Sequence, residues 1–390
     1  TDGTVPTADS PLYTGAISVA ANTVVQAVAV RNNLLSDTAS ATAPAQSGSS
    51  SGGTAAGGSG SVTSSETVTN PDGSTTTTVT NRRTGAVTET TRYPDGATLV
   101  VETAADGTVT TTETDVGGNV IETVENPDGS GVVTVERADG SGSVTALRPD
   151  GGADAQATLS AEAVAEAQAA GQPAALPLPA LTAADSSDDA PTVAVSLPGD
   201  DAVRVEIPLE NGTAGTVAVL VGADGTETVL TATLPTDTGV AVLLTDGDTV
   251  KLVENSKSFA DVSSSHWAAE AIAFATGREL LNGTASDAFT PAAWAGAAGV
   301  SDGTNPEGRL TREQLAVMLW RYAGAPAGSG SLDAFTDGDR VSSYAADGLR
   351  WAVGAGILDG VGDGVLAPQG SATRAQVAAI LMRFLLIQNG

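Results

Sequence analysis

The spacing of glycines between residues 62 and 152 restricts the fold of this chain more than any other feature. Eight glycines recur there, first at an interval of 12 residues and then at six intervals of 11. They are Gly73, Gly85, Gly96, Gly107, Gly118, Gly129, Gly140 and Gly151. Most follow an aspartate, as in Asp128-Gly129, and this pair tolerates the positive φ of a tight hairpin turn. The pattern predicts antiparallel strands of about seven residues, such as 75–79 and 109–113, joined by short turns.

These strands offer little for a deep core, because both faces are largely Thr, Glu and Val. We therefore expect a single-layer or very thin meander that acts as a stalk. Backbone ladders and cross-strand Thr pairs, worth a few tenths to about 1 kcal/mol each, would hold it together. The Asp-Gly turns lack the alternating oxygen ligands and the terminal Glu of an EF-hand loop, so we interpret them as structural turns and not as calcium sites.

The chain before this meander divides into two parts. Residues 1–43 contain alternating apolar runs near 17–19 and 24–30, which predict two or three strands of a partial β-sandwich. Residues 44–61 are nearly all Gly, Ser, Ala and Thr, the composition of a flexible linker. Because the chain begins at Thr1 without a methionine, we expect it to be the carboxyl-terminal part of a longer protein, so no signal peptide is expected.

Residues 153–257 predict a small separate domain of α+β or β-sandwich type. A helix should begin at Ser160 and stop at Gly171, with Pro173 just beyond. Six short strands should follow, near 192–197, 203–207, 216–221, 227–234, 240–244 and 249–253. This segment contains no recognisable nucleophile, metal cluster or phosphate loop.

Composition excludes several classes of partner. The chain carries a net charge of −29, and residues 259–390 hold 13 acidic and 8 basic side chains against 33 and 9 in the remainder. Such an acidic body repels nucleic acid and anionic lipid.

No run of about 18 apolar residues is present, so we expect no membrane span. Cysteine is absent, which excludes disulfides and thiolate metal sites and is typical of exported bacterial proteins. All four Trp follow residue 266, so the best-built core should lie in the last third.

That last third contains an internal duplication. Residues 267–291 align without a gap on residues 344–368, at a shift of 77. We call residues 259–291 the first copy and residues 335–368 the second copy. Each predicts a helix, then a Gly-containing loop and a Pro, and a second helix should follow.

Two helix starts, Thr311-Arg312-Glu313-Gln314 and Thr373-Arg374-Ala375-Gln376, are also alike. Apolar residues follow each at i, i+3, i+4 and i+7. In both, Thr and Gln are placed to form a capping box. The arginine is unusual, since the helix dipole disfavours a cation there by about 0.3–1 kcal/mol. We interpret Arg312 and Arg374, beside free backbone N–H groups, as anion sites; the alternative is that a neighbouring carboxylate compensates each arginine.

The residues of this last third resemble S-layer homology repeats. The resemblance rests on Phe259-Ala260-Asp261-Val262, His266-Trp267-Ala268, the 283–291 loop and the two Thr-Arg helix starts, and it spans about 130 residues. It implies an all-α module, usually of three repeats, that holds bacterial surface proteins on the cell wall without a covalent bond. The partner it implies is an anionic secondary cell-wall polysaccharide linked to peptidoglycan, often pyruvylated. The polysaccharide-binding residues expected here are Arg312, Arg374, Thr311, Thr373, Trp267 and Trp351.

The sequence departs from this pattern after Pro291, where a Thr-Arg start is expected within about six residues. Instead, residues 294–303 match residues 351–360. We therefore expect the second half of repeat one and the first half of repeat two to be absent from the module at 258–390. Either a fused hybrid repeat packs in their place, or the module has only two functional grooves.

The beginning of the chain carries a second resemblance. Asp2-Gly3-Thr4-Val5-Pro6-Thr7, Tyr13-Thr14-Gly15 and the run at 24–30 are similar to the C-terminal β-sandwich module of chitobiase-type glycosidases. This likeness covers about 40 residues and carries no catalytic residue.

Single residues outside these motifs have simpler interpretations. His266 lacks evident partners for catalysis or metal binding, so we expect it to cap or pack. The four Trp should lie on helical stripes, mostly in the core, although one of them could line a sugar-facing groove. Asp337 with Asp339, or Asp359 with Asp363, could bind calcium, but solvated turn carboxylates fit better. Arg321 and Arg383 should lie late in their helices, where the dipole favours them.

The predicted fold class is multi-domain, mainly β and then all-α. The leading hypothesis is a secreted, non-enzymatic protein held on the cell wall or in the S-layer of a Gram-positive-type bacterium, with no catalytic residue, metal or cofactor. One alternative is the carboxyl-terminal part of a secreted glycan-active enzyme whose catalytic domain lies upstream. Another is a self-associating surface-layer or adhesin stalk.

Overall fold

The computed structural model describes residues 62–292 and 309–389, together with four short strands between residues 24 and 42. The chain forms two compact units, Thr1–Gly60 and Ser61–Gly390. In the first unit, β1 (Val24–Ala27) pairs with β4 (Ala39–Thr42), and β2 (Val30–Arg31) pairs with β3 (Leu34–Leu35), both antiparallel. The predicted strand near 17–19 and the predicted linker at 44–61 lie outside the described residues.

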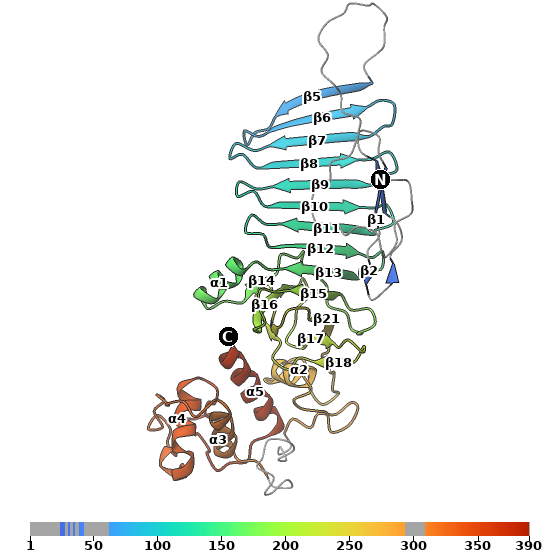
Figure 1. Ribbon diagram of the computed structural model, residues 1–390. Helices are drawn as coiled ribbons and strands as arrows, with labels where there is room; N and C mark the ends of the chain where they lie inside the picture. Colours follow the sequence, from blue (N-terminus) through green and yellow to red (C-terminus); the bar gives the residue numbers. More distant parts are fainter. Residues whose placement is uncertain are drawn as a thin grey trace, which may run out of the picture. The chain divides into compact units, whose positions relative to one another are not determined.

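The second unit begins with the predicted meander, residues 62–152, in which each strand pairs antiparallel with the next (Figure 1). The strands are β5 (Thr63–Thr69), β6 (Thr75–Asn81), β7 (Val87–Arg92), β8 (Thr98–Thr103), β9 (Val109–Thr114), β10 (Val120–Glu125), β11 (Gly131–Glu136) and β12 (Gly142–Leu147), and β13 (Ala153–Thr158) continues the same sheet. The two strands predicted at 75–79 and 109–113 are confirmed. The sheet runs across the predicted boundary at residue 152 without a break.

Six of the eight turns of the meander follow one design, in which an aspartate precedes the glycine. All eight predicted glycines have positive φ, between 82° and 100°. In the turn after β10, the Gly129 N–H donates to Asn126 O at 3.0 Å and the Asn126 N–H donates to Ser130 O at 2.8 Å. Oδ1 of Asp128 accepts from the Ser130 N–H at 3.0 Å and from Ser130 Oγ at 2.7 Å. The aspartate therefore closes the turn, and glycine supplies the left-handed backbone that closure requires.

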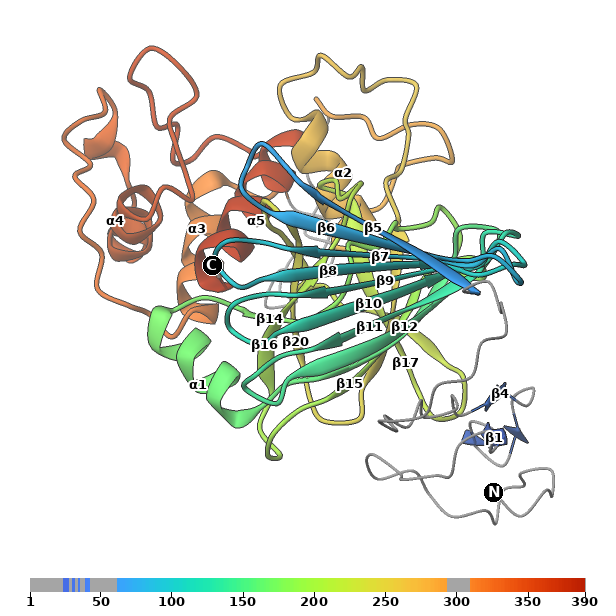
Figure 2. The same cartoon turned by 90° about the horizontal axis from the view of Figure 1, so that it is seen from above.

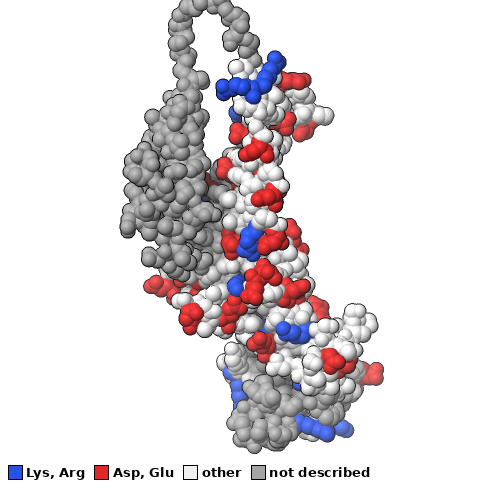
Figure 3. Space-filling model, turned by 90° about the vertical axis from the view of Figure 1, so that its right-hand side faces the viewer, with Lys and Arg blue, Asp and Glu red and all other residues white. Residues whose placement is uncertain are grey.

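The meander is one layer thick at its amino-terminal end. The side chains of β5 to β10 are exposed or half-buried on both faces, whereas β11 alternates, with Val133 and Val135 buried and Val132 exposed. Figure 2 shows these strands as one twisted layer, and Figure 3, which looks toward the strand ends on the right of Figure 1, shows acidic side chains along the stack. The expected Thr pairs are present, with Oγ1–Oγ1 distances of 3.0 Å for Thr67–Thr77 and 2.8 Å for Thr76–Thr91.

The next segment, residues 153–257, is called the β-domain below. As predicted, its helix α1 (Ala161–Ala170) begins after Ser160, whose Oγ accepts from the Ala163 N–H at 3.1 Å, and it ends at Gly171 with φ 66°. The further strands are β14 (Ala174–Ala175), β15 (Thr192–Ser196), β16 (Val203–Pro208), β17 (Thr216–Val221), β18 (Glu227–Val229), β19 (Leu234–Pro235), β20 (Gly239–Leu244) and β21 (Thr249–Glu254).

Two sheets enclose the core of the β-domain. The large sheet extends from the meander in the order β13-β15-β21-β17-β18, with β13 and β15 parallel, and faces a second sheet in the order β14-β16-β20-β19. Fully buried side chains between them include Val193, Val205, Ile207, Val240 and Leu252. The predicted strand at 227–234 is wrong in one respect: a turn in which the Thr233 N–H bonds Leu230 O divides it between the two sheets.

The remaining residues, 258–390, form the helical module. Its helices are α2 (Ala269–Gly277), α3 (Arg312–Tyr322), α4 (Ala346–Gly354) and α5 (Arg374–Asn389), with short 3-10 turns η1 (Gly338–Arg340) and η2 (Ser343–Ala345). α2 and α4 stand at the predicted shift of 77 residues, which agrees with the duplication. α2 packs on α5 and α3 packs on α4. The predicted hybrid repeat at 294–303 lies outside the described residues.

Helix α5 connects the two halves of this module. Its Ala375 and Ala378 pack with Ala271 and Ile272 of α2, whereas Ile380 and Phe384 pack with residues of α3 and α4. Within the described ranges, no helix has both the length and the apolar composition that a membrane crossing requires.

The turn aspartates predict a measurable pH dependence. Hydrogen bonds from residues across each turn hold the pKa of Asp72, Asp106, Asp115, Asp128 and Asp150 below the usual 3.8. Because the folded-state pKa is lower than the unfolded one, this contribution to stability is full above about pH 4 and is lost as the pH falls through the folded-state values. Replacing all five by Asn keeps an acceptor oxygen and removes the titration. The thermal midpoint of the wild type, followed by circular dichroism, should fall relative to this variant below about pH 4. Parallel pH profiles would contradict this assignment.

Candidate functional site

Both Thr-Arg helix starts form the predicted capping box. Thr311 Oγ1 accepts from the Gln314 N–H at 3.2 Å, and the Thr311 N–H donates to Gln314 Oε1 at 3.0 Å. The equivalent distances between Thr373 and Gln376 are 3.2 and 3.1 Å. The two threonine hydroxyls therefore serve the helix starts.

Three backbone N–H groups at these starts are not free, and the prediction that free amides add to an anion site is wrong for these three. The Arg312 N–H donates to Gly370 O at 3.0 Å, and the Glu313 N–H donates to Pro368 O at 2.9 Å. At the other start, the Ala375 N–H donates to Pro291 O at 3.1 Å. Loops that end the two copies thus satisfy donors that would otherwise face a ligand.

The two predicted arginines occupy equivalent positions. Arg312 donates from Nε to Leu366 O at 2.9 Å and from Nη2 to Asp359 O, both in the second copy. Arg374 donates from Nε to Phe289 O at 2.8 Å and from Nη2 to Asn282 O, both in the first copy. The acceptors differ by the same shift of 77 residues. Each arginine thus fixes the loop of one copy to the helix that packs on that copy.

Aspartates hold the same loops from the other side. Asp337 accepts from the N–H groups of Leu366 and Ala367 at 2.8 and 2.9 Å. Asp261 accepts likewise from Phe289 and Thr290 at 2.9 and 2.6 Å. Thr290 and Ala367 have φ of 53° and 51°, a backbone that non-glycine residues rarely adopt. The Asp337 oxygens predicted as possible calcium ligands therefore serve the loop.

Neither arginine forms an ion pair with a carboxylate in the described part of the chain. Burial lowers the pKa of Arg312, against the opposing charges of Asp359 and Asp337. Burial also lowers the pKa of Arg374, and Asp261 opposes this. The neighbouring carboxylates of Asp359, Asp337 and Asp261 thus compensate the two charges in part, without a direct ion pair.

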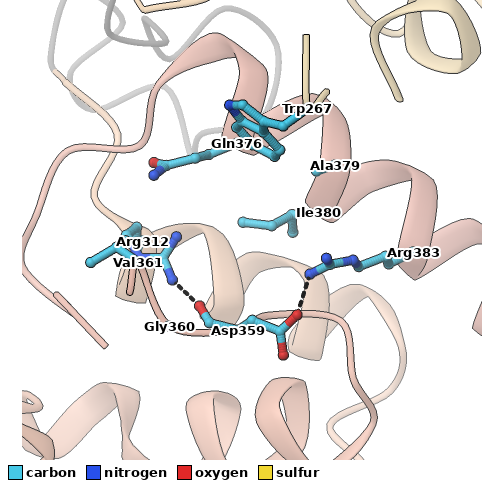
Figure 4. A pocket seen from close by; sticks show the side chains of 9 residues that line it. All are labelled: Trp267, Arg312, Asp359, Gly360, Val361, Gln376, Ala379, Ile380 and Arg383. Carbon is cyan, nitrogen blue, oxygen red and sulfur yellow. Dashed lines mark hydrogen bonds and ion pairs between the residues drawn. The ribbon is translucent and has the colours of Figure 1, made fainter. Parts of the chain in front are cut away.

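A cavity of about 400 Å³ opens beside Arg312 (Figure 4). Its lining residues are Trp267, Arg312, Asp359, Gly360, Val361, Gln376, Ala379, Ile380 and Arg383. Arg312 is only 4% exposed. A guanidinium has five N–H groups. The two carbonyls accept from only two of these, the Nε–H and one N–H of Nη2. Among the described residues nothing accepts from Nη1, which Figure 4 shows directed toward the cavity.

Arg383 is a lining residue that the sequence interpretation missed. Its Nη1 lies 2.8 Å from Asp359 Oδ2, and the two side chains are 40% and 69% exposed. The expectation that Arg383 lies at the end of its helix is wrong, because α5 continues to Asn389. Gln376, Ile380 and Arg383 fall at i, i+4 and i+7, so this face of α5 could have been recognised from the spacing.

The described tryptophans lie mostly in the core, as predicted, and one of them lines the cavity. Trp267 precedes α2, is 66% exposed, and its ring stacks on His266 with a centroid distance of 5.8 Å. His266 Nδ1 accepts from the Ala268 N–H at 3.1 Å, a contact just before the first turn of α2. Trp351 is buried in the core beside Phe384 and does not line the cavity. Trp320 is half-buried, and Trp294 lies outside the described residues.

The structure thus brings Arg312 and Trp267 together and leaves Arg374 and Trp351 outside the cavity. The cavity has two guanidinium groups, one carboxylate, an aromatic face and an apolar wall of Val361 and Ile380. This combination suits a ligand with a carboxylate and a sugar ring. Within the described ranges no three His, Asp or Glu side chains come together as metal ligands.

Comparison with known proteins agrees with the duplication. The S-layer homology domain model matches residues 258–293 and 334–378, and the chitobiase/beta-hexosaminidase C-terminal domain model matches residues 1–42. An amylopullulanase of Thermoanaerobacterium thermosulfurigenes is 29% identical over 137 residues, which cover 33% of this chain and 6% of that enzyme. The matched modules are non-catalytic. The helical module therefore carries an S-layer homology domain, and residues 1–42 match the chitobiase/beta-hexosaminidase C-terminal domain.

Proposed function

We propose that the helical module attaches the protein to the bacterial cell wall by binding an anionic secondary wall polysaccharide in the Arg312 cavity. A pyruvylated polymer is the ligand for the tests below. The S-layer homology match supports attachment to a wall polymer at the cell surface. The observation that carries the choice of site is the Arg312 guanidinium, which is buried, held by two carbonyls, and still has N–H groups directed into a cavity.

A preorganised guanidinium suits this role. Because Leu366 O and Asp359 O fix its orientation, little side-chain entropy remains to be lost when an anion binds. The Nε edge is occupied, so a ligand carboxylate would accept from Nη1 and from the second N–H of Nη2. The grip therefore comes from the end of the guanidinium and not from its Nε side.

The neighbouring groups define the rest of the proposed site. Arg383 adds a second positive charge, and Asp359 partly neutralises it through their 2.8 Å ion pair. The exposed ring of Trp267 offers a flat apolar surface to the face of a sugar. A carboxylate at Arg312 with its sugar ring against Trp267 uses all three side chains.

A second candidate function follows from the amylopullulanase similarity. It favours a chain in which these modules hold a glycan-active catalytic domain at the cell surface. Sequencing the coding region upstream of Thr1 tests this candidate, and an upstream region that encodes no catalytic domain would exclude it.

The first prediction compares Arg312→Lys with Arg374→Lys. Each replacement removes equivalent bonds to two backbone carbonyls, but only Arg312 lines the cavity. Arg312→Lys should weaken binding of the pyruvylated polymer roughly tenfold or more, since hydrogen bonds to charged groups are worth about 1.5–3 kcal/mol. Arg374→Lys should have a much smaller effect. Calorimetry measures both affinities, and circular dichroism checks folding. An equal loss in the two variants would contradict the cavity as the site.

The second prediction uses changes of opposite sign. Arg383→Gln should weaken binding roughly fivefold and reduce its salt dependence, because one partly exposed cation is lost. Asp359→Asn should strengthen binding, because a carboxylate that repels the ligand is removed while the Asp359 carbonyl still holds Arg312. Arg321→Gln, at the equivalent position of α3, is the control. A polymer from which acid has removed the pyruvyl groups should bind the wild type and these three variants with equal affinity. If Asp359→Asn weakened binding of the intact polymer, the anion model would fail.

The third prediction concerns Trp267. Trp267→Ala should reduce affinity roughly threefold to tenfold through lost ring contact. Its thermal midpoint should stay unchanged, because the side chain is 66% exposed. Tyr322→Ala is the matched control, since Tyr322 is 82% exposed in the same module and does not line the cavity. Equal affinities of the two variants would remove Trp267 from the site.

A further inference from the structure

Arg278, directly after α2, is fully buried where the helical module meets the β-domain. Its Nε donates to Thr233 O at 2.8 Å, its Nη1 donates to Ala214 O at 2.6 Å, and its Nη2 donates to Thr216 O at 3.2 Å. All three acceptors belong to the β-domain. Nη1 also donates to Phe274 O at 3.1 Å within the helical module. One side chain therefore connects three backbone positions of one domain to the end of a helix in the other.

The charge of Arg278 is met by dipoles and an aromatic face. The guanidinium carbon lies 3.6 Å from the centre of the Phe274 ring. Burial lowers the pKa of Arg278 to about 9, and the charge of Glu254 opposes this shift. The residue is thus still charged near neutral pH, and removal of its carbonyl partners would leave a buried charge unsatisfied.

Backbone contact between the two domains is equally close. Asn255 Nδ2 donates to Gly277 O at 2.6 Å. A Cβ placed on Gly277 would lie 2.8 Å from Gly215 O, so the β-domain leaves no room for a side chain at position 277. Beside this contact, Leu234 and Ala241 of the β-domain pack with Phe274 of α2 and with Met382, Leu385 and Leu386 of α5.

The second copy shows what this contact replaces. Gly354 is the equivalent of Gly277, and a Cβ on Gly354 would lie 2.6 Å from the backbone nitrogen of Gly330. The Gly330 N–H also donates to Arg350 O at 3.0 Å. The chain that precedes the second copy within the module thus covers the end of α4. In the first copy, a β-domain loop at Gly215 covers the end of α2 in the same way. The residue after the helix is Ala355 in the second copy and Arg278 in the first, so the docking arginine occurs only where the β-domain is the neighbour.

We infer that the β-domain completes the helical module, in the place where a preceding repeat segment would lie, and that residues 153–390 fold as one unit. The β-domain supplies covering surface to α2 and α5, in a chain whose sequence predicts that two half-repeats are absent. The smallest stable wall anchor is therefore larger than the region of repeat similarity. This inference does not depend on which polymer the cavity binds.

Two spectroscopic probes test it in the full chain. All four Trp lie in the helical module, so their fluorescence reports only that part, whereas far-ultraviolet circular dichroism also reports the sheets. In the wild type the two thermal midpoints should coincide. Arg278→Ala should lower the fluorescence midpoint by roughly 5 °C or more, because several charged hydrogen bonds are lost. Arg321→Ala, an exposed arginine of α3, is the control and should leave both midpoints unchanged.

Gly277→Ala keeps the test decisive if Arg278→Ala does not fold. Alanine favours a helix more than glycine does, so a lower fluorescence midpoint in this variant reports the lost contact with Gly215. A drop of both midpoints together also supports a single unit, since the two parts then unfold cooperatively. Two separate transitions in the wild type, or effects of both variants no larger than that of Arg321→Ala, would overturn the inference.

Discussion

Hydrogen bonds from buried or half-buried guanidinium groups to backbone carbonyls hold the helical module together. Arg312 and Arg374 each fix a loop of one copy, and Arg278 fixes the module to the β-domain. Arginine suits these positions because its weakly hydrated, planar group has five fixed donors, so a single side chain satisfies several carbonyls at once. Loops with positive φ at Thr290 and Ala367 are costly in isolation and persist where aspartate and arginine hold both sides.

This interaction also explains why the proposed ligand site lies at Arg312 and not at the helix start. The backbone donors of the helix start are occupied by Gly370 and Pro368, whereas the guanidinium has more N–H groups than its two carbonyls use. A residue with a structural role thus keeps capacity for a ligand. The same surplus exists at Arg374, which does not line the Arg312 cavity.

Much of the fold follows from local sequence signals. The glycine period predicted the meander because each Asp-Gly turn is determined within five residues. Strand β13 was missed, although Ala153, Ala155 and Ala157 alternate as buried residues, because alanine has little strand preference. The Thr and Gln of both capping boxes were predictable for the same local reason, since they lie three residues apart.

Long-range partners were beyond such signals. Arg374 bonds carbonyls of the first copy, 85 and 92 residues earlier, and no local pattern shows that α5 packs there and not on the second copy. In the sequence, Arg278 looks like any polar residue at a helix end. Its role is evident only from the β-domain carbonyls that it contacts in the structure. Trp267 appeared to begin a core stripe, but α2 starts two residues later, so its ring is left at the rim of the cavity.

The single-layer stack has a mechanical consequence for a tethered protein. Ladder hydrogen bonds run across the strands, and therefore along the stack from β5 toward β13. A pull in that direction loads these bonds along their length and opens them one strand at a time, like a zipper. Each detached 11-residue repeat releases roughly 35–40 Å of extended chain. The meander would then lengthen in steps under drag while the enclosed β-domain and the helices behind it stay folded.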